Sequence, residues 1–222
     1  MKSHAFSILF LVLAASVSAA GFGFGVSGGY ILNDSVTSLA SPAVSSETKL
    51  TYAPFGASLY TDLGFVVVSV GYNQLVLGND LMTQTVTGTS TTLLNASTGT
   101  AGYVVLAMMG KYPFALGTLT LSPLLGFELD LNVLLLDASG TDLRAAMSSA
   151  QQSGQNQVWL KAGAALDVDI SRRVYVRSAA FFGYKLRSAS EQSAYMSAEQ
   201  AGFSILMFVI RPEIAVSLGI KM

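Results

Sequence analysis

The stretch 118–132 alternates between apolar and polar residues along its whole length. Leucine, proline or phenylalanine stands at every odd position from 119 to 131, and the even positions carry mostly threonine, serine, glycine, acidic residues and asparagine. Successive side chains of a β-strand point to opposite faces, so this pattern predicts a long strand with one apolar face. Such a strand requires either a protein core or a lipid bilayer on its apolar side.

The composition favours strands that face lipid. Of the 222 residues, 51% are hydrophobic and only 11% are charged, whereas about a quarter of the residues of a typical soluble domain are charged. Beyond the N-terminus, no uninterrupted apolar run approaches the ~18–20 residues of a membrane-spanning helix. The net charge of -1 and the lack of a basic cluster argue against nucleic acid as a partner.

The first twenty residues have the pattern of a secretory signal peptide. Lys2 supplies a positive start, residues 5–15 are mostly apolar, and small residues at 18–20 suit a signal peptidase. The alternative, a single membrane anchor, requires a longer apolar stretch. We therefore expect residues 1–20 to be removed and residues 21–222 to form the mature protein.

Most catalytic and metal-binding chemistry is excluded by what the chain lacks. It contains no cysteine, and its single histidine, His4, lies in the segment that is expected to be cleaved. The mature chain therefore has no disulfide, no thiol nucleophile, no imidazole base and no imidazole metal ligand. We predict that it is not an enzyme and uses no cofactor, although carboxylate or lysine chemistry stays formally open.

Seven further segments alternate in the same way as 118–132. With it, the predicted strands are 21–32, 51–63, 65–77, 102–112, 118–132, 158–170, 174–187 and 210–222. The connections between them are alternately long and short. This pattern predicts an all-β fold, an eight-stranded antiparallel up-and-down transmembrane β-barrel with long extracellular loops and short periplasmic turns.

The long connections are the polar segments 34–49, 78–100, 134–157 and 188–200. A short helix capped by Thr141 and Asp142 is expected at 143–152, and 188–200 is either a loop or a second helix. Three prolines, Pro54, Pro123 and Pro212, fall within predicted strands. Each lacks a backbone N–H and therefore needs a bulge or a strand end nearby.

A soluble eight-stranded barrel of the lipocalin type is the structural alternative. Its exterior would carry frequent charges, whereas the polar faces of these strands are dominated by glycine, alanine and serine. Small residues suit the crowded interior of a narrow barrel better than a wet exterior. The sequence therefore favours apolar side chains that point outward to lipid.

The charged residues of the strands then point into the lumen. The predicted lumen-lining network is Lys111, Glu128, Asp130, Lys161, Asp167, Asp169, Arg177, Lys185, Arg187, Glu213 and Lys221. Asp167 and Arg177 lie equally far from Arg172 in a tight turn, so we expect them to form an ion pair. The network either fills and stiffens the barrel or gates a narrow passage.

The heights of these charges along the barrel follow from their distances to the turns. Lys111, Asp169 and Lys221 are expected near the turn side. A second group is expected at the loop-side mouth, namely Glu128, Asp130, Lys161, Lys185 and Arg187.

Residues 111–114 and 119–127 resemble the fourth and fifth strands of small bacterial outer-membrane barrels of the OmpW and OmpX type. The hairpin with Trp159, Gly163, Asp167 and Arg173, and the last strand with Pro212, Ser217 and Gly219, are similar to their counterparts in that family. One departure is the C-terminal residue, which is Met222 where the family usually has an aromatic residue.

This resemblance implies the bacterial outer membrane as location, with outer-membrane lipids and the outer-membrane assembly machinery as partners. An OmpW-like protein is a narrow passive conduit for small, in part hydrophobic, solutes. An OmpX-like protein is a plugged barrel whose loops bind surface ligands. The predicted loops are poor in charge and aromatic residues, so from the sequence we favour the conduit.

Overall fold

The computed structural model describes residues 21–39, 44–86, 89–95, 99–137, 139–187, 196 and 203–222. The elements are β1 (Gly21–Gly29), β2 (Ile31–Leu39), β3 (Val44–Asp62), β4 (Val66–Val86), β5 (Thr89–Asn95), β6 (Gly99–Lys111), β7 (Phe114–Leu116), β8 (Leu119–Leu136), η2 (Leu143–Ala146), α2 (Ser149–Gly154), β9 (Gln157–Asp169), β10 (Val174–Leu186) and β11 (Phe203–Lys221). The predicted signal peptide lies outside the described residues.

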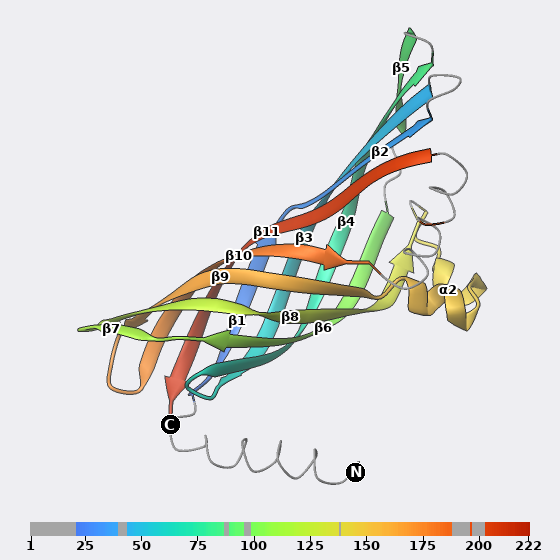
Figure 1. The fold of residues 1–222 in the computed structure, drawn as a ribbon. Helices are drawn as coiled ribbons and strands as arrows, with labels where there is room; N and C mark the ends of the chain where they lie inside the picture. The colour runs from blue at the N-terminus through green and yellow to red at the C-terminus, as the bar shows by residue number, and fades with distance from the viewer. Residues whose placement is uncertain are drawn as a thin grey trace, which may run out of the picture.

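The strands form a closed antiparallel barrel (Figure 1). β1 and β2 follow one another along a single position in the wall, between β3 and β11. The other seven wall strands are β3, β4, β6, β8, β9, β10 and β11. Pairing of β1 with β11 closes the ring. The structure thus confirms the predicted all-β class and the eight-stranded antiparallel barrel.

The two ends of the barrel differ. At one end, called the turn side below, lie the short connections after β3 and after β9, together with Gly21 and Lys221, which are register partners. The other end is called the loop side. There β2, β3, β4, β5 and β11 continue beyond β9 and β10 and form a projecting sheet (Figure 1).

The prediction of long loops at 34–49 and 78–100 is wrong. Residues 34–49 are largely strand, because β2 and β3 pair from Ile31 and Tyr52 to Leu39 and Val44. Likewise β4 runs on to Val86 and pairs with β5. These segments are rich in serine, threonine and valine, which favour strands, and a continued ladder satisfies backbone groups that a loop would leave to water.

The predicted helix at 143–152 is two shorter pieces. Asp142 accepts a hydrogen bond from the Arg144 amide and caps η2, which ends at Ala146. Ser148 then starts α2 through a capping box with Gln151. Apart from Met196, the predicted loop or helix at 188–200 lies outside the described residues. No helix in the described part of the chain is long and apolar enough to cross a membrane.

All three strand prolines lie beside interruptions in a neighbouring strand. Pro54 and Pro212 flank the break at Tyr30 between β1 and β2, where the Tyr30 amide donates to the Pro212 carbonyl at 3.0 Å. Pro123 faces the break between β6 and β7, where the Tyr112 amide donates to its carbonyl at 3.3 Å. The ladder is thus interrupted where proline has no N–H to donate.

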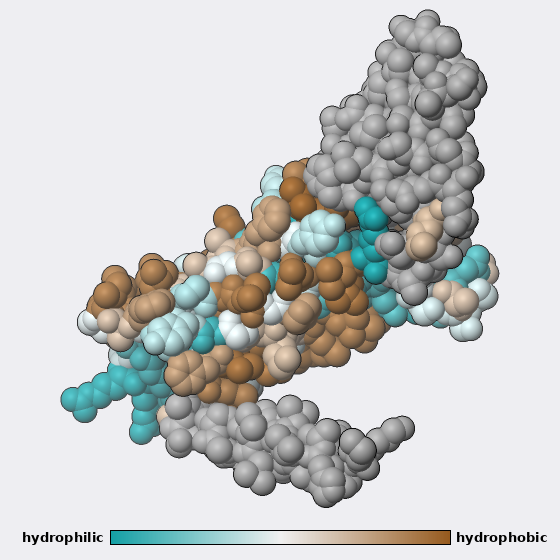
Figure 2. All heavy atoms as spheres, in the orientation of Figure 1, coloured by the Kyte–Doolittle hydropathy of each residue, from teal (hydrophilic) through white to brown (hydrophobic). Residues whose placement is uncertain are grey.

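The barrel wall is apolar outside and polar inside. Along β8, Leu125 is 61% exposed, whereas Asp130, on the other face, is 3% exposed. Figure 2 shows apolar side chains covering much of the visible barrel exterior, with hydrophilic groups towards the ends. This polarity is the inverse of a soluble barrel, and it brings the charged side chains of six strands together in the lumen.

Candidate functional site

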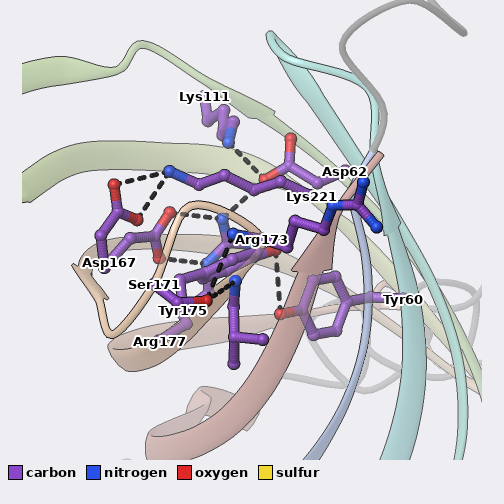
Figure 3. Close-up of polar contacts among 11 residues, drawn as sticks. Tyr60, Asp62, Lys111, Asp167, Ser171, Arg173, Tyr175, Arg177 and Lys221 are labelled. Carbon is purple, nitrogen blue, oxygen red and sulfur yellow. Dashed lines mark hydrogen bonds and ion pairs between the residues drawn. The ribbon is translucent and has the colours of Figure 1, made fainter.

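Four charged residues form a cluster inside the turn side of the barrel (Figure 3). Arg177 of β10 donates from Nε and Nη2 to the two carboxylate oxygens of Asp167 on β9, at 2.6 and 2.7 Å. Its Nη2 also lies 2.6 Å from Asp62 of β3, and Lys111 of β6 binds the same Asp62 oxygen. We call Asp62, Lys111, Asp167 and Arg177 the turn-side cluster. Its two positive and two negative charges balance.

Two tyrosines hold the guanidinium of Arg177 in place. The rings of Tyr60 and Tyr175 lie 5.1 and 5.4 Å from its central carbon, and the Tyr60 hydroxyl donates to the Tyr175 hydroxyl at 3.1 Å. Gly23 and Gly219 make room for these rings, since a Cβ at either position would overlap the tyrosine. Glycine therefore lets a large aromatic ring lie flat against the inner wall.

The turn-side mouth carries one further ion pair. Lys221 Nζ lies 2.6 Å from Asp169, and both side chains are partly exposed. A cavity of about 300 Å³ opens here, lined by Asp62, Lys111, Asp167, Asp169, Tyr175 and Lys221 among others. Both cations that line this cavity, Lys111 and Lys221, have a carboxylate partner.

A second group of charges lies deeper in the lumen. Lys161 of β9 donates to Glu128 of β8 at 2.9 Å and to Glu213 of β11 at 3.1 Å. Arg211 of β11 binds Glu128, donates to Asp130 at 3.0 Å and lies 3.3 Å from Glu213. We call these five residues the central cluster. Every one of them is buried.

Trp159 of β9 completes the central cluster. The side chain is fully buried, its Nε1 donates to Asp130 Oδ2 at 3.0 Å, and its ring lies 4.5 Å from the guanidinium carbon of Arg211. Indole and guanidinium attract each other strongly when both are shielded from water. Trp159 thus fixes both the cation and the carboxylate of one ion pair.

Ion pairs of the two clusters cross the lumen between strands that are not neighbours in the wall. In the order of the strands around the barrel, β3 and β9 are on opposite walls, and Arg177 joins a carboxylate from each. Between the clusters remains a cavity of about 100 Å³, lined on one side by small and polar residues of β1, β3 and β4, including Gly25, Ser27, Ser58, Ser69 and Asn73. This space suits a few water molecules rather than a large solute.

The predicted network is largely brought together. Asp167 and Arg177 are register partners and pair as predicted, and Lys111, Asp169 and Lys221 lie at the turn side. The predicted position of Glu128, Asp130 and Lys161 at the loop-side mouth is wrong, because they are buried in the central cluster. The cations of β11 and β9 draw their carboxylates inward. Lys185 and Arg187 lie further towards the loop side, and Lys185 is the register partner of Trp159.

Sequence reasoning missed Asp62, Arg211 and the roles of Trp159 and Tyr175. Asp62 lies near the end of the predicted strand 51–63 and has the same parity as Tyr60 on the inner face. Arg211 has the same parity as Glu213, so the alternation could have found it. Within the described residues, no group of three or more His, Cys, Asp or Glu side chains is arranged to hold a metal ion.

Comparisons with known proteins find similar structures but no matching sequence family. No protein-family model and no curated protein matches this sequence. The crystal structure of Neisserial surface protein A (NspA) is similar with a TM-score of 0.43 at 11% identity, covering 90% of this chain and 97% of that one. The translocator domain of the autotransporter NalP from Neisseria meningitidis follows with a TM-score of 0.32 at 10% identity, covering 100% and 97% of the two chains.

Proposed function

We propose that this protein is an outer-membrane β-barrel with a closed lumen, and that it displays its loop-side sheet for contact with ligands at the cell surface. The apolar exterior supports the membrane location, since side chains such as Phe55, Leu125 and Ile214 are each more than half exposed. Strands of 13 residues, such as β9 and β10, exceed the ~9–11 that cross a bilayer at a tilt.

The observation that carries this proposal is the pair of ion-pair clusters across the lumen. Each cluster contains buried charges whose partners come from several strands. Separating a buried ion pair leaves an uncompensated charge, at a cost of about 3–5 kcal/mol. Several such pairs would have to separate together to open a passage, which favours a closed barrel over a freely conducting one.

The projecting sheet supports the display part of the proposal. β3, β4 and β11 have 19, 21 and 19 residues, against 13 in β9 and β10. The additional residues lie on the loop side, where β5, β4, β3, β2 and β11 are neighbours in one sheet. A sheet that extends well beyond the membrane presents a broad and ordered surface to a ligand.

Two measurements test this proposal. Purified protein in planar lipid bilayers is expected to give no steady conductance above that of the lipid alone. Cells that produce the protein are expected to adhere to immobilised extracellular-matrix proteins, and cells with shortened β2–β3 and β4–β5 hairpins are expected to lose that adhesion. Steady conductance of the folded wild-type protein, or equal adhesion of both kinds of cell, would contradict it.

A narrow conduit for small solutes is the second candidate. The cavity between the clusters favours it, because small and hydroxyl-bearing residues of β1, β3 and β4 form one side of that space. Uptake of a small solute into liposomes that contain the wild-type protein, with no uptake into empty liposomes, would favour the conduit over display alone.

A further inference from the structure

Within the described residues, three buried oxygen atoms on the inner face of β8 have no hydrogen-bond partner: Ser122 Oγ, Asp130 Oδ1 and Asn132 Oδ1. Asp130 and Asn132 are the two that lie at the central cluster. The residues occupy successive positions on the same face of the strand, and both side chains are nearly inaccessible to solvent. A buried acceptor without a donor costs about 1–3 kcal/mol. Two neighbouring ones indicate a donor between them.

The orientation of both side chains is fixed by their other contacts. Asn132 Nδ2 donates to the Gly102 and Leu134 carbonyls at 3.4 and 3.0 Å, so the amide oxygen must point away from them. Asp130 Oδ2 accepts from Trp159 and from Arg211, both at 3.0 Å. Only Asp130 Oδ1 and Asn132 Oδ1 are left to share a donor.

The charges of the central cluster indicate what the donor is. Three carboxylates, Glu128, Asp130 and Glu213, face two cations, Lys161 and Arg211. One negative charge is in excess in a buried site, where an unbalanced charge is strongly disfavoured. A single hydrogen ion would balance this charge and supply the missing donor at once.

We propose that Asp130 is protonated on Oδ1 in the folded barrel and donates this hydrogen to Asn132 Oδ1. A carboxyl group becomes neutral when it takes up one proton, and its hydroxyl then donates a hydrogen bond. Loss of the proton to solvent regenerates the carboxylate, and no other bond changes. Asp130 and Asn132 together thus form a binding site for one proton.

A water molecule or a metal ion would account for fewer of these observations than a proton does. A water molecule would supply donors but leave the excess negative charge. A metal ion such as Ca²⁺ takes about six to eight oxygen ligands, whereas only two unpartnered oxygens lie here. The proton is the one occupant that satisfies both the charge and the hydrogen bonds.

The other ionisable groups around this site come from five strands. Glu128 is on β8, Lys161 is on β9, and Arg211 and Glu213 are on β11. Tyr103 of β6 is the register partner of Asn132. Lys185 of β10 is the register partner of Trp159 and could contribute a positive charge from the loop side, so the test includes it.

Trp159 is the only tryptophan of the chain, and it donates directly to Asp130. Its fluorescence therefore reports the charge of that carboxyl group. In the folded full-length protein in lipid vesicles, we expect a one-proton transition of this fluorescence as the pH is raised. Asp130→Asn, whose amide can also donate to Asn132, should keep the low-pH spectrum at every pH. Lys185→Gln should leave the transition in place.

Three results would overturn the proposal. The first is a transition that persists unchanged in folded Asp130→Asn. The second is a wild-type spectrum that responds to Na⁺ or K⁺ at fixed pH and ionic strength. The third needs no variant: the infrared difference spectrum of the wild-type protein between low and high pH should contain the band of a neutral carboxylic acid in the barrel, and its absence would exclude a protonated Asp130.

Discussion

Arg211 Nη1 of β11 donates to Asp130 Oδ2 of β8 across the inside of the barrel, at 3.0 Å. The two strands are separated in the wall by β9 and β10. This contact therefore ties together parts of the wall that no backbone ladder joins, and both side chains are buried.

Arg211→Met is expected to destabilise the barrel by about 3–5 kcal/mol, because the two buried carboxylates of Glu128 and Glu213 must then share the single charge of Lys161. Arg211→Lys should destabilise it less, since it keeps the charge but loses the planar group that contacts Trp159, Glu128 and Asp130 together. Denaturant unfolding from lipid vesicles measures both. Equal stability of Arg211→Met and the wild type would contradict the inferred role.

Asp167→Asn and Arg177→Met are expected to show non-additive effects on the free energy of unfolding. The two residues share a bidentate contact, so a double-mutant cycle should give a coupling of about 1–3 kcal/mol. The matched control is the partly exposed pair Asp169 and Lys221, for which a coupling below about 1 kcal/mol is expected. Purely additive losses at Asp167 and Arg177 would rule out the pair as a stabilising contact.

Gly126→Ala is expected to destabilise the barrel by about 1–3 kcal/mol, because of overpacking. A Cβ at this position would overlap the Met108 carbonyl oxygen and lie 2.7 Å from the Met109 Cα, both of them backbone atoms. Gly110→Ala, in the same pair of strands, is the control, since the nearest atom to its Cβ would be 3.5 Å away. The midpoint of thermal unfolding should be clearly lower for Gly126→Ala than for Gly110→Ala. Equal midpoints would contradict the predicted overlap, because the backbone would then have accommodated the added Cβ at Gly126.

Leu125→Arg is expected to reduce stability in a bilayer by about 2–4 kcal/mol, as an arginine on the lipid face near the midplane does. Leu125 is on the apolar exterior. Ala150→Arg, at an exposed position of α2, should have little effect. Unfolding from lipid vesicles provides the comparison, and an unaffected Leu125→Arg variant would argue that this face does not contact lipid.

Asp137, just beyond β8, is expected to titrate at an unusually low pH. Hydrogen bonds from the Ser139 hydroxyl and the Thr141 amide hold the pKa of this exposed carboxyl below its ordinary value. The contribution of these bonds to the turn is present above the ordinary aspartate pKa of about 3.9 and is lost as the pH falls through the lower folded value. An NMR titration of the Asp137 carboxyl group should give a pKa below the ordinary value, and Ser139→Ala should move that pKa back upward.

Much of the fold follows from alternation alone. The pattern of 118–132 predicts β8, which spans Leu119–Leu136, and the same rule predicts which side of each wall strand is apolar. It fails beyond the barrel, where 34–39 pairs with 44–49 and 80–86 pairs with 89–95. Serine and threonine are compatible with both loops and strands, so only the neighbouring ladder determines which of the two forms.

The candidate site was predictable in part for a similar reason. Parity along a strand places Asp167, Arg177, Lys161 and Glu213 in the lumen, and the tight turn sets Asp167 opposite Arg177. Parity does not give the height at which distant strands meet. The membership of Asp62 and Arg211 in the clusters therefore follows only from the positions of β3 and β11 in the barrel.

The sequence by itself determined an eight-stranded wall with an apolar exterior and a charged interior, because a period of two assigns each side chain to a face whatever its partners are. Only the tertiary structure decided that the charges meet as two separate clusters inside the barrel. The stagger between strands fixes which carboxylates and cations share a level, and this depends on pairings between residues as far apart as Glu128 and Arg211.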